Sequence, residues 1–430
     1  MLTALFSAIS GLSANGIALS VIGDNVANMN TVGFKSSRIA FGDVLSQTIT
    51  GIAGNSQVGR GVLVSGITPL FTQGSFETSA SALDMAIDGE GFFIVSNGSG
   101  RFFTRAGQFT LDKDGKIVNP DGYILQGYLA DDSGNITGTI GDIVISTQQA
   151  AANPTSQVSF TVNLDARESV PSAAFTLDGN SDGVNDDPAN YNFSTQVTVY
   201  DSQGNAREVT AYFVKTAVNA WTVHYVHEDP AAPGELTEAG TQDLTFGLNG
   251  ELTDDNSGTA VSFNFGGGIV SPQDIYFNYG TGTAEGGTGF DGSSQYAAEF
   301  SVTNLTQDGY SAGALKNINI EQDGTITGIF TNGQTRVIGQ IALAKFAAPT
   351  ELTKLGRNLY GESYSSGQPI VGAASSGGLG RVLSNTLELS NVDLAEEFIR
   401  MISAQRGFQA NSRIITTTDD LLQELVNLKR

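Results

Sequence analysis

The residues best suited to acid–base or metal chemistry are the only two histidines, His224 and His227, in the segment WTVHYVHED. Residues i and i+3 of a strand point to opposite faces of a sheet, so these imidazoles are not placed to bind one metal ion. No Ser-His-Asp arrangement and no glycine-rich phosphate-binding or dinucleotide-binding motif is recognisable. Cysteine is absent, which excludes thiolate catalysis, zinc–thiolate sites and disulfides. We therefore expect no enzymatic activity, no catalytic residues and no cofactor.

A second candidate for chemistry is the acidic loop DGNSDGVNDDPA, residues 178–189. Four side chains match positions 1, 3, 5 and 9 of a calcium-binding loop: Asp178, Asn180, Asp182 and Asp186. Gly183 matches position 6, but Ala189 stands where the bidentate glutamate belongs, and no helix is evident on either side. We expect a solvated loop without a metal, and weak calcium binding is the alternative.

Composition restricts the partners of the chain. The 430 residues carry a formal net charge of -23, which disfavours nucleic acid and anionic membrane surfaces. No run of about 18 apolar residues occurs, so we expect no membrane span. The apolar N-terminus lacks the basic region of a secretory signal peptide. The absence of cysteine is typical of a protein exported to an oxidising space without a disulfide catalyst, although chance is the alternative.

Both ends of the chain show helical periodicity. The N-terminal apolar residues fall on a 3–4 spacing: Leu2, Leu5, Ile9, Leu12, Leu19 and Val26. They predict one apolar stripe on a helix of roughly 27 residues, about 40 Å long. Gly11, Gly16 and Gly23 each disfavour the helix by about 1 kcal/mol relative to alanine, so this helix needs a partner.

The C-terminal segment supplies that partner. Ser390 followed by Asp393 predicts a capping box, and Asp393, Glu396 and Glu397 suit the positive end of a helix dipole. One stripe keeps the 3–4 spacing: Leu394, Phe398, Met401, Phe408, Ile415, Leu422 and Val426. A second stripe comprises Ile414, Leu421, Leu425 and Leu428. Two stripes predict that more than one face of this helix is buried, as in a coiled-coil-like assembly.

The chain between these helices reads as β structure, with alternating apolar runs and turns such as NGSG and NPDG. The fold class we predict is mainly β with α-helical termini: paired terminal helices and two nested all-β domains. The predicted helical domain combines 1–30 with 390–430, and extended linkers occupy 31–75 and 365–389. An inner β domain is formed by 76–149 with 313–364, and an outer β domain is inserted at 150–312.

Four segments together resemble the bacterial flagellar axial proteins, the family of rod and hook subunits. They are NVANMNTVGFKSSR (25–38), residues 58–95 with SALDMAIDGEGFFIV, residues 104–128 with TRAGQFTLDKDG, and residues 391–428 with NVDLAEEFIRMISAQRGFQAN. Within the family the chain looks most like a hook subunit, because it has a large middle region. The distal rod subunit, which is shorter, is the alternative.

The resemblance implies a structural, self-assembling subunit of the flagellum. Copies would form a curved helical tube that transmits motor torque to the filament as a universal joint. The implied partners are further copies, the rod, hook-cap and hook–filament junction proteins, and the type III export apparatus. The implied location is extracellular, in the hook of the basal body, where the subunit serves motility.

In such a tube the stretch after the first helix is a boundary. Its members are Asn25, Asn28, Asn30, Gly33, Phe34, Lys35 and Arg38. Asn28, Asn30 and Gly33 would end the helix, and Lys35 and Arg38 could bridge acidic residues of an adjacent subunit or be ordinary surface charges. An alternative from a different functional class is that the chain is a secreted, β-rich surface adhesin. That alternative does not explain why both ends of the chain carry apolar stripes.

Overall fold

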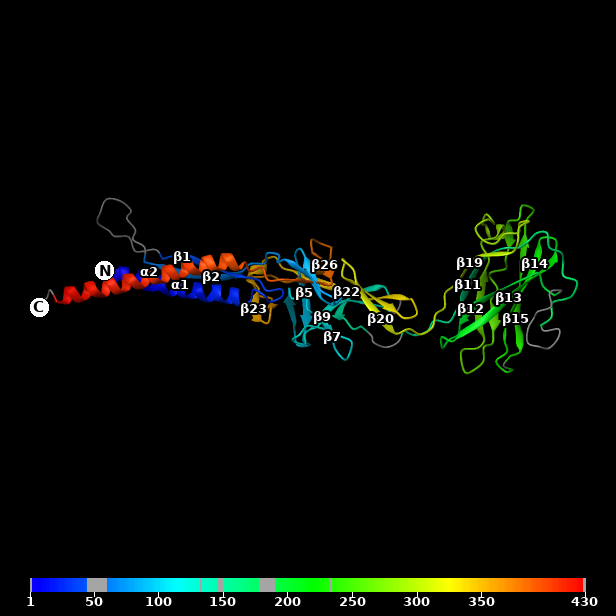
Figure 1. The fold of residues 1–430 in the computed structure, drawn as a ribbon, viewed down its shortest axis with the longest axis horizontal. Coiled ribbons are helices and arrows are strands. Elements are labelled where there is room, and N and C mark those ends of the chain that lie inside the picture. The colour runs from blue at the N-terminus through cyan, green and yellow to red at the C-terminus, as the bar shows by residue number, and fades with distance from the viewer. Residues whose placement is uncertain are drawn as a thin grey trace. The chain divides into compact units, whose positions relative to one another are not determined.

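The computed structural model describes the chain except residues 1, 45–59, 132–133, 146–149, 178–189, 233 and 428–430, together with the side chains of 2–3 and 425–427. The chain divides into two compact units. The first comprises 1–147, 316–329 and 335–430, and the second comprises 148–315 and 330–334. The predicted mainly β chain with a helix at each end is confirmed (Figure 1).

The terminal helices are α1 (Leu2–Ala27) and α2 (Leu394–Asn427), which lie side by side in the first unit (Figure 1). An antiparallel hairpin of β1 (Ser37–Asp43) and β2 (Val62–Pro69) packs against α1. Helix α2 begins one residue after Asp393, whose Oδ1 accepts hydrogen bonds from the backbone N–H groups of Ala395 (2.8 Å) and Glu396 (3.2 Å). The cap is therefore Asp393 and not Ser390, because its carboxylate reaches the unpaired N–H groups of the first turn.

The rest of the first unit is built around a sheet in which twelve strands are described. Its central order is β20-β21-β22-β9-β5-β6-β24-β23. The strands are β5 (Phe92–Ser96), β6 (Arg101–Thr104), β7 (Thr110–Leu111), β8 (Ile117–Val118), β9 (Ile124–Ala130), β10 (Ile136–Asp142), β20 (Leu315–Ile320), β21 (Thr325–Phe330), β22 (Thr335–Lys345), β23 (Thr353–Gly356), β24 (Leu359–Gly361) and β25 (Ile370–Ala373). Aromatic edge-to-face pairs, such as Phe92 with Phe346 and Phe103 with Phe346, fill its core.

Two short ribbons join the sheet region to the helices. Strand β26 (Arg381–Ser384) pairs with β4 (Met85–Asp88), and β27 (Thr386–Glu388) pairs with β3 (Phe76–Thr78). Strand β25 pairs with β22 in the large sheet. The expectation that 365–389 is an extended linker is therefore wrong for these strands, because their backbone groups are paired in sheets. The same holds for β1 and β2 in the segment 31–75.

The second unit contains two sheets that share one hydrophobic core. Their orders are β17-β18-β11-β19 and β12-β13-β14-β15-β16. The strands are β11 (Gln157–Asn163), β12 (Phe193–Tyr200), β13 (Ala206–Ala217), β14 (Ala220–Glu228), β15 (Leu236–Phe246), β16 (Leu252–Asp254), β17 (Val261–Phe263), β18 (Gln273–Asn278) and β19 (Ser301–Gln307). Tyr225 and Tyr279, both fully buried, join their hydroxyl groups across this core at 2.9 Å. Each short 3-10 helix, η1 (Thr283–Glu285) and η2 (Pro349–Glu351), lies in a loop.

The chain enters and leaves the second unit side by side. The backbone of Ala150 exchanges hydrogen bonds with that of Gly313 (2.8 and 3.2 Å), and Asn153 does the same with Tyr310 (3.0 and 2.9 Å). An insertion whose two ends are paired in this way can be replaced by a short turn without separating the flanking strands.

Candidate functional site: the helix pair and its charged junction

The two terminal helices pair antiparallel through residues with small side chains. Gly11 of α1 lies opposite Asn411 of α2, and Gly407 of α2 lies opposite Asn15 of α1. A Cβ atom at Gly11 would stand 2.8 Å from Nδ2 of Asn411, and one at Gly407 would stand 2.8 Å from Oδ1 of Asn15. Each asparagine amide donates to the carbonyl oxygen four residues earlier, in the first case Asn15 to Gly11 at 2.7 Å. The helices therefore approach closely where glycine leaves room for an asparagine.

This seam differs in part from the predicted stripes. The buried residues of α1 are mostly small: Ala8, Gly11, Ala14, Ala18, Ile22 and Asn25. The predicted stripe residues are half-buried at Leu5, Leu12, Leu19 and Val26, whereas Ile9 is 47% exposed. Close approach of two helices selects small residues at the contact and turns larger ones toward its margins. The side chain of Leu2 lies outside the described residues.

On α2 the buried residues are Glu397, Ala404 and Thr418. Of the predicted stripe, Met401, Ile415 and Leu422 are half-buried, Leu394, Phe398 and Phe408 are exposed, and the side chain of Val426 is not described. The second predicted stripe is exposed at Ile414 and Leu421. Many large apolar side chains of α2 are thus exposed within the part of the chain that the structure describes.

The stretch that follows α1 folds back onto the base of both helices. Asn25 is buried, accepts a hydrogen bond from the backbone N–H of Ser37 (2.9 Å) and donates to the Ser37 carbonyl (2.9 Å). Its amide also donates to Oε1 of Glu397 in α2 at 3.3 Å. Asn25 therefore joins α1, β1 and α2 at one point.

Other predicted boundary residues lie in the turn and loop that follow Ala27, the last residue of α1. Asn28 donates to the Asp24 carbonyl (2.9 Å) and accepts from Thr31 (3.1 Å), while Asn30 is exposed. Gly33 has a φ of 69°, and its Cβ would stand 2.5 Å from the backbone nitrogen of Ala106, so only glycine fits. Phe34 is buried with the Lys354 ammonium 5.7 Å from its ring centre.

A buried ion cluster lies at the base of the helix pair, and we call Lys35, Arg105 and Glu388 the junction cluster. The Lys35 ammonium contacts Oε1 of Glu388 at 2.5 Å, and the Arg105 guanidinium contacts Oε2 at 3.4 Å. Lys35 and Glu388 are fully buried, and Arg105 is nearly so. Glu388 Oε1 also accepts from the N–H of Gly74 (2.9 Å), and its carbonyl accepts from Gly33 (2.7 Å). One carboxylate thus ties together four separate parts of the chain.

Burial dominates the electrostatics of this cluster. Desolvation lowers the pKa of Lys35 below its ordinary value, and the nearby Glu388 carboxylate opposes that change. Desolvation likewise lowers the pKa of the Arg105 guanidinium, again against Glu388. The expectation that Lys35 bridges to an adjacent subunit is therefore wrong, because its ammonium is enclosed and already paired. Arg38 is exposed, and no described carboxylate lies within ion-pair distance of it.

The two histidines do not form a metal site. His224 stacks on Phe175 at 4.0 Å between ring centres and contacts Oε1 of Glu238 at 2.7 Å. His227 is buried beside Phe263 and Phe265. The residues of the proposed calcium loop, Asp178, Asn180, Asp182 and Asp186, lie outside the described residues, so weak calcium binding there stays a prediction.

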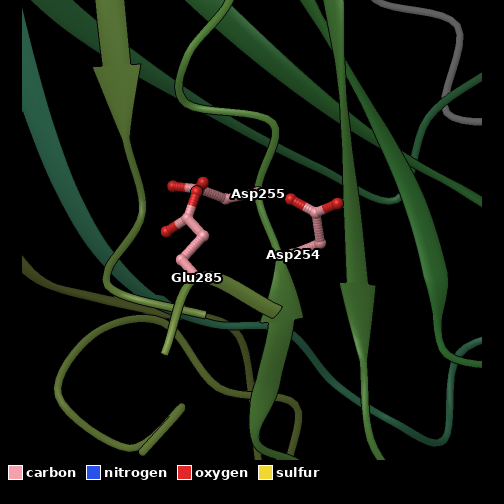
Figure 2. A group of neighbouring side chains, drawn as sticks. All are labelled: Asp254, Asp255 and Glu285. Atoms are coloured by element: carbon pink, nitrogen blue, oxygen red, sulfur yellow. The ribbon is translucent and has the colours of Figure 1, made fainter. Parts of the chain in front are cut away.

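The structure brings together an acidic group that the sequence did not reveal. The carboxylate oxygens of Asp254, Asp255 and Glu285 lie within 4.8 Å of one another (Figure 2). Asp255 is buried and accepts from the N–H groups of Ser257 (3.0 Å) and Tyr279 (2.8 Å). Protein donors thus explain the buried carboxylate, and we assign no ion to the group.

Helix α1 passes one test for a membrane span. From Ala4 to Ala27 it is long and apolar enough to cross a bilayer by length and composition. The core helix of a soluble protein passes the same test, and this helix packs against α2. The absence of a membrane span stays a prediction.

Comparison with known proteins identifies the class. Four family models match in chain order: flagella basal body rod protein (5–35), flagellar hook protein FlgE/F/G D1 domain (86–165), flagellar basal body protein FlaE D2 domain (163–310) and flagellar basal body rod FlgEFG protein C-terminal (383–428). Helices at both termini, two β units between them and these matches define a flagellar axial protein.

Full-length relatives narrow the class. The flagellar hook protein FlgE of Salmonella typhimurium is 38% identical over 98% of this chain and 99% of its own length. That of Borreliella burgdorferi is 37% identical over 100% of both chains. The crystal structure of Helicobacter pylori flagellar hook protein FlgE2 shares the fold, with a TM-score of 0.52 and 16% identity over 73% of this chain and 100% of that one. The chain belongs to the flagellar hook protein family.

Proposed function

We propose that this hook-family subunit polymerises through its terminal helices into a curved helical tube, which transmits motor torque as a universal joint. The supporting observation is the apolar surface left exposed on the helix pair. Its large members are Phe6, Ile9, Ile17, Leu394, Phe398, Ile399, Ile402, Phe408, Ile414 and Leu421. Many large apolar side chains exposed on one pair of helices favour a protein–protein interface there. Identical copies that bind head-to-tail form an open helix.

The helix pair also has too small a core to be rigid in a free subunit. Among the described residues, its buried cluster comprises Ala18, Ile22 and Ala404, with Leu19, Val26, Ile39 and Met401 at its margin. The core of the second unit is far larger. The pair should therefore order fully only when further copies cover its outer face.

The remaining assignments follow from family membership. The subunit would be exported by the flagellar type III apparatus, reside outside the cell and meet rod, hook-cap and hook–filament junction proteins. It would act as a structural protein without catalysis. Residues 150–312 would form the outer layer of the tube, and 76–149 with 313–364 its middle layer.

Electron microscopy of polymers from the purified full-length chain tests the proposal. Curved tubes support a hook, and straight tubes would favour the distal rod alternative. Removal of residues 391–430 should abolish polymerisation. The double variant Ile399→Ser with Ile402→Ser, which changes only exposed residues of α2, should weaken it while leaving the β units folded.

If the chain is an adhesin, removal of residues 391–430 should leave its function intact. An adhesin truncated after residue 390 would keep its binding, because binding would reside in the β units. Polymerisation that persists without α2 would contradict the proposal.

The role of the second unit can be tested by deleting residues 150–312 and closing the gap with a short glycine turn. The paired backbones of Ala150 and Gly313 make this closure feasible. If sliding of the outer layer permits the curve, the shortened subunit should give straight or rigid tubes. An unchanged curved tube would remove the second unit from the mechanism of bending.

A further inference from the structure

The antiparallel register leaves the C-terminal end of α2 without an α1 partner. Gly11 lies opposite Asn411, and Asn25 contacts Glu397. Continued along the helices, this register places residue 421 opposite the first residue of the chain. Helix α2 runs on to Asn427, and Figure 1 shows it extending past the N-terminal end of α1. Residues 422–427 of α2 therefore extend beyond α1, and Leu421 lies where this overhang begins.

The outward face of this end has a simple pattern of charge and apolarity. We define the α2 end segment as residues 417–424. Leu421 is 53% exposed, and the exposed carboxylate of Glu424 lies three residues further on, on the same face of the helix. No basic side chain occurs in the segment. The face therefore presents one large apolar side chain beside a negative charge.

A groove of about 400 Å³ lies at the other end of the helix pair, where α1, β1 and α2 meet. Ala18 and Ile22 of α1 and Ile39 of β1 supply apolar walls. Phe41, 50% exposed, and the exposed Arg38 also line it. A groove of this composition can receive one large apolar side chain.

Polar groups in the groove are incompletely satisfied. The Arg400 guanidinium is paired with Glu396 and Glu397 in the same helix, at 2.5 and 3.1 Å. Arg38 has no such carboxylate among the described residues. Oε2 of Glu397 has no hydrogen-bond partner among the described residues, but it is buried and therefore closed to a group that enters the groove. Within the described part of the chain, the groove thus offers the guanidinium of Arg38 as its unpaired charge.

We propose that the α2 end segment of one copy docks in the groove of a second copy. Leu421 enters between Ile22, Ile39 and Phe41, and Glu424, three residues further along the same face of the helix, pairs with Arg38. This inference rests on the proposed polymerisation and names one of its contacts.

Geometry excludes the same contact within a single chain. Glu397 in the groove and Leu421 lie on one continuous helix, about 36 Å apart at 1.5 Å per residue. A contact between the segment and the groove must therefore join two molecules. It would connect copies lengthwise, end of one helix pair to base of the next.

Cysteine cross-linking tests the contact directly, because the chain has no cysteine of its own. Full-length Phe41→Cys and full-length Leu421→Cys are mixed, polymerised and oxidised. We expect a disulfide-linked dimer of the two variants that forms only under polymerising conditions. The matched control replaces Phe41→Cys by Val218→Cys, which is 87% exposed in the second unit. Polymers without the Phe41–Leu421 cross-link, or with equal linking to Val218→Cys, would overturn the contact while leaving polymerisation established.

Charge reversal gives an independent readout. Arg38→Glu and Glu424→Arg should each raise the critical concentration for polymerisation by about five-fold to ten-fold, and the combined variant should recover most of this loss. The exposed Arg101→Glu is the control and should change nothing. The pairing would be refuted if each single variant polymerised normally. It would also be refuted if the combined variant raised the critical concentration by the product of the two single effects. Failure of the unmodified chain to polymerise would instead refute the proposed function, and this contact with it.

Discussion

The side chain of Asn411 in α2 fills the space beside Gly11 of α1, because a Cβ atom at Gly11 would stand 2.8 Å from Nδ2 of Asn411. Gly23, on the same helix, has no atom near its missing Cβ. The two glycines thus look alike in sequence and differ in structure.

The different surroundings of Gly11 and Gly23 predict different effects of replacing each glycine by alanine. Gly23→Ala should stabilise α1 by about 1 kcal/mol, because alanine favours the helix and meets no neighbour. Gly11→Ala should yield little or none of this gain, because its Cβ displaces Asn411. Amide hydrogen exchange of α1 in the dilute full-length chain measures both. Equal protection in the two variants would show that the helices do not pack at Gly11.

The junction cluster predicts a large loss of stability on neutralising its carboxylate. Glu388→Gln would leave the buried charges of Lys35 and Arg105 without a counter-ion, which costs about 3–5 kcal/mol. Urea unfolding of the first unit measures the loss. Glu77→Gln is the control, because Glu77 is exposed on the neighbouring strand β3 and should lose almost nothing. A Glu388→Gln variant as stable as this control would contradict the buried pairing.

The N-terminal cap of α2 predicts that substitution of Asp393 destabilises the helix more than substitution of Ser390. Asp393→Ala should destabilise α2 by about 1 kcal/mol, because two N–H groups of the first turn lose their acceptor. Ser390→Ala should have a smaller effect, since its hydroxyl accepts only from Val392 at 3.3 Å, outside the helix. Circular dichroism of thermal unfolding compares them. A larger loss at Ser390 would restore the cap expected from sequence.

His227 predicts a pH dependence of the second unit. Burial lowers the pKa of His227 below its ordinary value of 6.5, so the unfolded chain binds this proton more readily than the folded one. The free energy of unfolding should therefore fall as pH drops from 6.5 toward the folded-state pKa. His227→Gln should flatten the stability profile in that window, because the group whose pKa differs between the folded and unfolded chain is removed. Identical profiles for the native chain and His227→Gln would place the imidazole in solvent.

The sequence by itself determined the helix at each end and the β structure between them, but not the paired strands within 31–75 and 365–389. The 3–4 spacing near each end predicted the two helices, and alternation with turns predicted β structure between them, because these patterns are local. The four motifs gave the family. The spacing of apolar residues could not show which face of each helix is buried. In the structure small residues such as Ala18 are buried, whereas Ile9 is exposed.

Only the tertiary structure assembled the junction. Lys35, Arg105 and Glu388 are far apart in the chain, and a lone lysine reads as a surface charge until its buried counter-ion is known. Glu388 is the acidic residue in the otherwise uncharged sequence TLELS, and this was the sequence feature that could have indicated a buried carboxylate. Periodicity reports the neighbours of a residue along the chain, whereas the burial of a charge depends on partners that only folding brings within reach.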